Sequence, residues 1–136
     1  MSLLTKPKVV IDTNVFISGA VFGGNPGRIL KLIEDDKIQV VVSPPIELEI
    51  LIKMAKFSVS KEVVSSLKAL LEQRAILVVP VKKVTVCRDP KDNMFLEASL
   101  ESGADILITG DKDLLEMKEF KGTKILTPAE FLQKSK

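Results

Sequence analysis

Five short apolar runs alternate with helix-like segments along the chain, and this alternation constrains the fold more than any other feature. The runs cover 9–11, 38–42, 76–79, 106–108 and 124–126. Continuous apolar runs of this length are typical of strands buried on both faces of a sheet. Because helical segments separate the runs, we expect an α/β fold, in which a central, mostly parallel five-stranded sheet is the middle layer of a three-layer α/β/α sandwich. No linker or repeat interrupts the pattern, so we expect one domain over residues 1–136.

The helices between these runs begin and end at recognisable capping residues. Apolar spacing over 29–33 predicts one helix, after a Gly-rich loop at 23–27. Three hydroxyl side chains are expected to begin further helices: Ser43, Ser60 and Thr127. Gly103 is expected to end the helix that precedes the run at 106–108. A short extended piece is expected at 84–86.

The residue types that are missing narrow the possible chemistry. The chain has no His, one Cys, no Trp or Tyr, and six Phe. These counts exclude His-ligated zinc, a Ser-His-Asp triad and a Cys-rich metal site. The formal net charge of +2 is too small to indicate nucleic-acid or membrane binding by itself. Any bound metal must therefore have oxygen ligands, and any acid or base must be a carboxylate, a Lys, the Cys or bound water.

Neither a signal peptide nor a membrane span is expected. Lys6, Pro7 and Lys8 interrupt the N-terminal segment before an apolar core of signal-peptide length can form. The longest apolar runs are far shorter than the ~20 residues that a membrane-spanning helix needs. We therefore expect a cytoplasmic protein without membrane association.

Two acids follow strands that should end at the same edge of the sheet. Asp12 follows the run at 9–11, and Asp111 closely follows the run at 106–108. Ligands of open parallel sheets bind outside the carboxyl ends of the strands. Either Asp alone could simply cap the next helix or turn. Two carboxylates brought together repel each other, and a bound cation is the usual compensation.

A third acid begins a helix, and a fourth lies within one. Asp92 is either a first-turn acid or a site residue, while Asp89 is better explained as a turn residue before a proline.

In the helix after Ser43, a helical wheel does not decide between Glu47 and Glu49. Glu49 lies on the polar arc, where it could form a surface pair with Lys53, whereas Glu47 lies on the apolar face. Either Glu could point into a pocket.

Together these segments resemble the PIN domain family. The resemblance rests on residues 10–18, the Ser43-Pro44 helix with its Glu, residues 88–96 and residues 108–114, and it extends to 127–132. It covers nearly the whole chain and is strongest to the branch of toxin components of toxin–antitoxin pairs. PIN domains are α/β/α sandwiches and metal-dependent ribonucleases that leave a 5′-phosphate and a 3′-hydroxyl. The resemblance thus implies a ribonuclease that is the toxin of a toxin–antitoxin pair, with an RNA processing or quality-control nuclease as the alternative.

The resemblance also implies roles for individual residues. The catalytic acids would be Asp12, Glu49, Asp92 and Asp111, with Asp12, Asp92 and Asp111 as metal ligands and Asn14, Thr109 and Asp113 in support. Glu49 is preferred to Glu47 because it directly precedes an aliphatic residue, Ile50, as the family's Glu does. Hard carboxylate oxygens favour Mg²⁺ or Mn²⁺, and one or two such ions can activate water for phosphodiester hydrolysis.

RNA, a second copy and an antitoxin are the expected partners. Four basic side chains are candidates to contact RNA phosphates: Arg28, Lys53, Lys91 and Lys112. For each one alone, a solvated helix face is the simpler explanation. The scarcity of aromatic residues argues against recognition by base stacking, so the expected substrate is single-stranded RNA held mainly through its phosphates. A homodimer and an antitoxin that blocks the site are implied by the resemblance alone.

Two other functions compete with the nuclease. A phosphatase or phospho-acceptor domain also carries an Asp at a strand end, as Asp12 is here, and usually a Lys at another strand end. In this chain the other strand ends carry acids, and Lys112 is the only nearby Lys. A non-catalytic scaffold that binds RNA or protein is the other alternative, and it has no need for four converging acids. Binding of a metal-fluoride phosphate mimic at Asp12 would favour the phosphatase or phospho-acceptor domain. Failure to bind divalent metal would favour the non-catalytic scaffold.

Overall fold

A six-stranded sheet lies at the centre of the computed structural model, which describes residues 6–134. In spatial order its strands are β3 (Ile76–Leu77), β2 (Gln39–Val42), β1 (Lys8–Ile11), β4 (Ile106–Ile108), β6 (Thr123–Leu126) and β5 (Glu119–Phe120). All neighbouring strands are parallel except β5, which runs antiparallel to β6. The signal-peptide prediction concerns residues that lie largely outside the described range.

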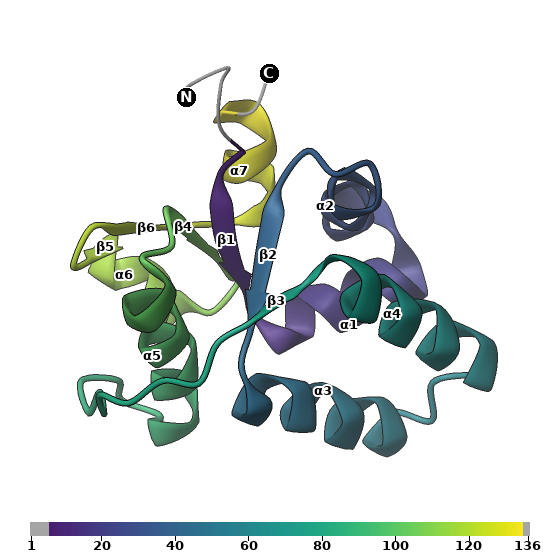
Figure 1. Cartoon of the computed structure of the whole chain (residues 1–136), viewed down its shortest axis with the longest axis horizontal. Coiled ribbons are helices and arrows are strands. Elements are labelled where there is room, and N and C mark those ends of the chain that lie inside the picture. The colour runs from purple at the N-terminus through teal and green to yellow at the C-terminus, as the bar shows by residue number, and fades with distance from the viewer. Residues whose placement is uncertain (1–5, 135–136) are drawn as a thin grey trace.

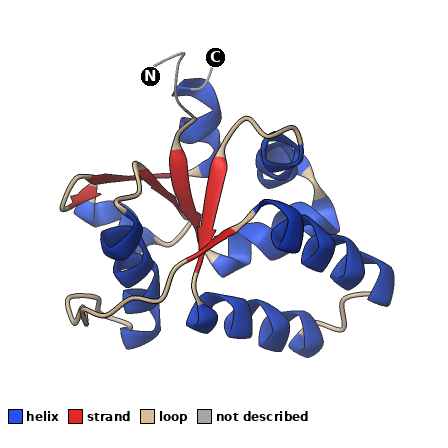
Figure 2. Cartoon of the chain, viewed as in Figure 1, coloured by secondary structure: helices blue, strands red, loops and turns tan. Residues whose placement is uncertain are grey.

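Helices cover both faces of this sheet, as Figures 1 and 2 show. They are α1 (Thr13–Phe22), α2 (Gly24–Glu34), α3 (Pro44–Lys56), α4 (Lys61–Arg74), α5 (Asn93–Ser102), α6 (Lys112–Met117) and α7 (Pro128–Lys134), with a 3-10 turn at Pro90–Asp92 before α5. In Figure 1, α5 and α6 lie on one side of the sheet and α1, α2 and α4 on the other. The predicted three-layer α/β/α sandwich is confirmed. None of the described helices is long and apolar enough to span a membrane.

The apolar runs form the buried central strands of the sheet, as their continuous apolar sequence predicts. The apolar residues of β1 and β2 are almost completely inaccessible to solvent because helices cover both faces of the central strands. The register pairs Ile11 of β1 with Ile108 of β4. The segments that follow these two strands therefore leave the sheet side by side at its carboxyl edge.

Three of the predicted helix starts are confirmed by their hydrogen bonds. The hydroxyl of Ser43 accepts from the amide of Ile46, and that of Ser60 accepts from the amide of Val63. Thr127 and Glu130 form a reciprocal capping box. Gly103 ends α5 in the left-handed conformation, with φ of 66°. The local sequence is thus sufficient to predict a helix start wherever a side chain caps the helix directly.

The predicted loop at 23–27 is wrong, because this segment joins two helices. The sequence analysis gave one helix before β2, whereas the structure has α1 and α2. Gly23, with φ of 80°, ends α1 through its amide, which donates to the carbonyl of Gly19. Pro26 lies in the first turn of α2, where a missing amide hydrogen costs nothing. Glycine and proline therefore mark a junction and a helix start here.

The edges of the sheet also differ from the prediction. The run at 76–79 pairs with β2 only at Ile76 and Leu77, and 84–86 lies in a loop without strand pairing. The sixth strand, β5, was not predicted because only two residues pair in it. Short edge strands depend on tertiary pairing more than on their own sequence pattern.

Candidate active site

The carboxyl edge of the sheet brings Asp12 and Asp111 together. Asp12 is the N-cap of α1, where its Oδ1 accepts from the amide of Asn14 at 3.0 Å. Asp111 is the N-cap of α6, where its Oδ2 accepts from the amide of Leu114 at 3.1 Å. Both acids therefore cap helices, as the simpler interpretation held, and both also line one pocket. Capping fixes each carboxylate at the positive end of a helix.

Thr109 links these two segments beneath the pocket. Its side chain is completely buried, and its hydroxyl donates to Oδ2 of Asp12 at 2.7 Å. The same hydroxyl oxygen accepts from the backbone amide of Asp111 at 3.0 Å. One side chain therefore orients the carboxylate at the end of β1 and the loop after β4.

The pocket itself has a volume of about 250 Å³ and is lined by residues from four segments. They are Asp12, Asn14, Glu49, Lys53, Asp89, Lys91, Asp92, Phe95 and Asp111. Glu49 and Lys53 are contributed by α3, which begins at the carboxyl end of β2 (Figure 1). Asp89, Lys91 and Asp92 come from the turn before α5.

Mutual repulsion and burial disturb the ionisation of the acids. Burial raises the pKa of Asp92 to about 6, and the negative charges of Asp111, Asp89 and Asp12 and a hydrogen bond shared with Asp111 add to this rise. Burial also raises the pKa of Asp12, which is only 5% exposed. The hydrogen bonds from Thr109 and Asn14 and the charge of Lys53 oppose that rise. The pocket thus holds more negative charge than its own cations compensate.

Comparison with known proteins identifies the family. The family model of the PIN domain matches residues 8–113. The chain belongs to the PIN-domain family. A relative of this PIN domain is an uncharacterized protein of Methanocaldococcus jannaschii, 37% identical over 142 residues that include 94% of this chain and 91% of that protein.

A solved structure shares the fold of this PIN domain. It is the crystal structure of VapBC2 from Rickettsia felis bound to a DNA fragment from their promoter. The match has a TM-score of 0.62 at 12% sequence identity and covers 87% of this chain and 96% of that chain. The resemblance inferred from the sequence is thus confirmed for the PIN family. PIN domains are generally nucleases, so the pocket is the place to look for hydrolytic chemistry.

The donor atoms of the PIN-domain pocket suit a hard divalent cation. The acids offer only carboxylate oxygens, the ligands that Mg²⁺ and Mn²⁺ prefer. Burial and then the charges of Asp111, Asp89 and Asp12 raise the pKa of Asp92, and a bound cation would offset both effects by favouring the ionised carboxylate. Among residues 6–134, however, no three His, Cys, Asp or Glu side chains converge tightly enough to form a ready-made metal cluster. The acids surround the pocket and would have to draw together around an ion.

The structure separates the two glutamates that the helical wheel left open. Glu49 lines the acid pocket, and its side chain is 19% exposed. Glu47 lies in a different, smaller pocket between α3 and α4, against Leu67 and Leu71. Only Glu49 is therefore placed to act with the other acids.

Other candidates fall outside the pocket. Asp113 lies in a neighbouring pocket, where its Oδ1 is 3.7 Å from Nη1 of Arg88. Arg28 and Lys112 are exposed and do not line the acid pocket. Conversely, the pocket contains Asp89, which the sequence indicates only as a turn residue, and Phe95, which has no functional signal in the sequence around it. Asp89 does cap the turn, by accepting from the amide of Lys91, and lines the pocket as well.

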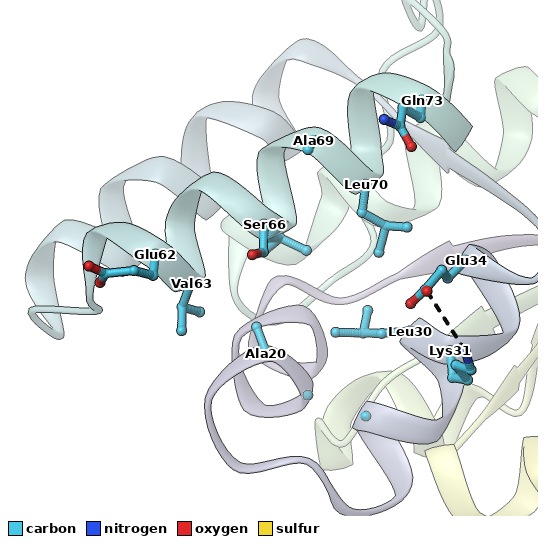
Figure 3. Close-up of a pocket in the computed structure, with 13 residues that line it drawn as sticks. Ala20, Leu30, Lys31, Glu34, Glu62, Val63, Ser66, Ala69, Leu70 and Gln73 are labelled. Atoms are coloured by element: carbon cyan, nitrogen blue, oxygen red, sulfur yellow. Dashed lines mark ion pairs between the residues drawn. The ribbon is translucent and has the colours of Figure 1, made fainter.

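A pocket larger than the acid pocket lies elsewhere. It has a volume of about 680 Å³ and separates α4 from α1 and α2 (Figure 3). An ion pair between Lys31 and Glu34 lies on its wall, and none of the four acids reaches it. Cys87 is no better a candidate nucleophile, because burial raises its pKa to about 11 and neighbouring carboxylates oppose the thiolate.

Replacing Thr109 by Val is expected to destabilise the protein by about 2 kcal/mol at pH 8, because a buried carboxylate loses a charge-assisted hydrogen bond. That bond favours the ionised form of Asp12 and lowers its pKa, so the loss should be smaller at pH 4. Urea unfolding at both pH values measures the difference. Thr109→Ser keeps the hydroxyl and serves as the control; equal stability of the two variants at pH 8 would contradict the assigned bond.

Proposed function

We propose that this chain is a metal-dependent ribonuclease that hydrolyses phosphodiester bonds of single-stranded RNA, and that it is the toxin of a toxin–antitoxin pair. One observation carries the proposal: Asp12, Glu49, Asp92 and Asp111 line the same pocket of a PIN domain. We also propose that residues 1–136 form a single domain.

In this proposal each acid has a distinct task. Asp12, Asp92 and Asp111 hold a divalent ion, while Glu49 acts from the outer shell. Mg²⁺ or Mn²⁺ bound there supplies an activated water and a sink for the charge that develops on the phosphate. Asp92, which lines the pocket beside Asp111, also orients the attacking water. Asn14 and Thr109 hold the carboxylate of Asp12 in place through hydrogen bonds to its two oxygens. The products are a 5′-phosphate and a 3′-hydroxyl.

RNA reaches the acids through the basic side chains beside them. Lys53 and Lys91 line the pocket, and Lys91 is exposed at its rim. Arg28 and Lys112 contribute only to longer-range attraction, which is screened by salt. Asp113, paired with Arg88, supports the loop beside the pocket.

The proposed toxin acts in the cytoplasm, as a homodimer that an antitoxin holds inactive. The fold shared with the VapBC2 toxin–antitoxin complex supports the antitoxin partner. Three exposed apolar side chains on α3 support an interface with a second copy: Leu48, Leu51 and Ile52.

The proposal predicts metal-dependent cleavage of a labelled single-stranded RNA. The purified protein should cut in Mn²⁺ or Mg²⁺ and should stop in excess EDTA, because the acids alone cannot activate water. An Asp12→Asn variant, purified in parallel, should be inactive. This variant is the essential control, since a contaminating ribonuclease would cut equally well in both preparations.

The outcomes separate the proposal from its competitors. Cleavage that needs metal and disappears in Asp12→Asn supports the ribonuclease. Equal cleavage by both preparations identifies a contaminating ribonuclease. A protein that binds no divalent metal contradicts the proposal and favours a non-catalytic scaffold. Binding of a metal-fluoride phosphate mimic at Asp12, without RNA cleavage, would favour a phosphatase instead.

A further inference from the structure

The acid pocket is lined by a cationic side chain, Lys53, as well as by the carboxylates that would bind a metal ion. Nζ of Lys53 donates to Oδ1 of Asn14 at 3.0 Å and lies 3.7 Å from Oε1 of Glu49. The Lys53 side chain is 30% exposed, so the ammonium is partly withdrawn from solvent. The contact with Asn14 joins residues 39 positions apart, and it therefore fixes α3 against the start of α1.

The ammonium of Lys53 contacts two of the residues that line the pocket, Asn14 and Glu49. Asn14, which it contacts, donates its backbone amide to Oδ1 of Asp12. Glu49, its other partner, lies one turn earlier on the same helix. Asp92 and Asp111 come from other segments, the turn before α5 and the start of α6, and the negative charge of Asp111 contributes to the raised pKa of Asp92. The pocket therefore has one carboxylate, that of Glu49, held in an ion pair with a lysine. Asp92 and Asp111 form no ion pair among the described residues, and Lys91, the other lysine of the lining, is exposed.

This difference between the carboxylates limits the number of divalent ions that the pocket can take. Two-metal nuclease sites place their ions about 4 Å apart, and each ion needs carboxylate ligands of its own. Glu49 already has a cationic partner within ion-pair distance. A divalent ion beside Glu49 would meet the positive charge of Lys53 directly, and this repulsion is strong in a partly desolvated pocket.

We propose that Lys53 takes the place of a second metal ion, so that the pocket binds a single divalent ion beside Asp92 and Asp111 while Glu49 holds the lysine. This inference rests on the proposed function, because it specifies how the proposed metal site is filled. Lys53 is then a positioning residue: it fixes Asn14 and Glu49 and excludes a second ion.

Counting bound Mn²⁺ tests the inference directly. Binding is followed by calorimetry and by the electron paramagnetic resonance signal of free and bound Mn²⁺. The wild-type protein should bind one ion, and Asp12→Asn should bind it at least about 100-fold more weakly. Lys53→Met, which keeps the length of the side chain, should bind two ions and show the spin-coupled signal of a Mn²⁺ pair. Lys53→Arg, which keeps the charge, should still bind one.

Glu49 provides the matched control. Glu49→Gln should leave the single ion of the wild-type protein in place. The double variant Lys53→Met/Glu49→Gln should bind one ion, whereas Lys53→Met alone should bind two, because the second ion has lost the carboxylate of Glu49. Thermal unfolding of each variant without metal verifies that the fold is retained, and both positions lie on the partly exposed face of α3.

The possible failures are distinguishable. Two ions bound to the wild-type protein, or a single ion bound to Lys53→Met, would overturn the role of Lys53 and leave the proposed ribonuclease intact. Loss of the wild-type ion in Glu49→Gln would also overturn the inference, because Glu49 would then be a ligand. Absence of any Mn²⁺ binding that depends on Asp12 would overturn both the inference and the metal-dependent function.

Discussion

Replacing Asp92 with Asn is expected to lower RNA cleavage by about 10³-fold, because the pocket loses a metal ligand and the group that orients water. The same change should stabilise the metal-free protein. Burial and the charges of Asp111, Asp89 and Asp12 raise the pKa of the wild-type carboxyl to about 6, from its ordinary value of 3.8. The folded protein therefore pays for ionising Asp92 at neutral pH, and the neutral amide removes that cost.

The sign and size of the stability change follow from the raised pKa. Between about pH 4 and pH 6 the folded state binds more protons at Asp92 than the unfolded state does, so the free energy of unfolding falls as pH rises. Above that window the loss is constant. Asp92 is only half-buried, and solvent screening reduces the gain of the Asn variant to about 1 kcal/mol at pH 8.

Thermal unfolding in EDTA from pH 4 to pH 8 measures this effect, and the fall attributed to Asp92 should vanish in the variant. Added Mn²⁺ should raise the melting temperature of the wild-type protein more than that of Asp92→Asn. Asp89→Asn is the matched control, since Asp89 lines the same pocket but has no proposed ligand role. An equal loss of cleavage in Asp89→Asn would contradict the assignment of Asp92.

The strand-end acids were predictable because their positions depend only on topology. Parallel strands expose their carboxyl ends at a common edge, and a buried strand can be recognised from its apolar residues. The register of Ile11 with Ile108 then brings Asp12 and Asp111 to one pocket. Their roles in binding metal and cleaving RNA rest on the PIN family and stay proposals.

The helix α1 was missed because it has no polar face to give it a helical period. Val15, Phe16 and Ile17 are consecutive and all buried, which also suits a strand or an apolar loop. The sequence analysis therefore assigns no helix between Asp12 and the Gly-rich segment at 23–27. Tertiary packing against α2 and the sheet, which a single sequence does not reveal, stabilises this helix.

A helical wheel could not decide between Glu47 and Glu49 for a related reason, and the preference for Glu49 came from the family resemblance. Exposed apolar residues on α3, such as Leu48 and Ile52, blur the boundary between its apolar and polar faces. Which Glu reaches the pocket depends on how α3 packs against the start of α1. The bond from Lys53 to Asn14 belongs to that packing, and nothing in the sequence joins these two residues.

The close approach of α1 to α2 leads to a second large effect, on stability. Gly19 of α1 faces the backbone of α2 so closely that a Cβ atom built on it would lie 2.8 Å from both the carbonyl carbon and the carbonyl oxygen of Pro26. It would also lie 3.0 Å from Cδ1 of Leu30. Backbone atoms cannot rotate away as a flexible side chain can, so the two helices would have to separate.

Gly19→Ala is therefore expected to destabilise the protein by about 2 kcal/mol, despite the gain in helix propensity that alanine ordinarily brings. Gly27→Ala, on the facing helix, should have the opposite sign. Its Cβ would lie 3.4 Å from the carbonyl oxygen of Gly19, an ordinary contact, so the propensity gain of up to about 1 kcal/mol should remain. Urea unfolding of both variants should separate them by about 3 kcal/mol. A stabilised Gly19→Ala variant would mean that α1 and α2 can part without cost, and the position of Asp12 at the start of α1 would then be less firmly held than the structure indicates.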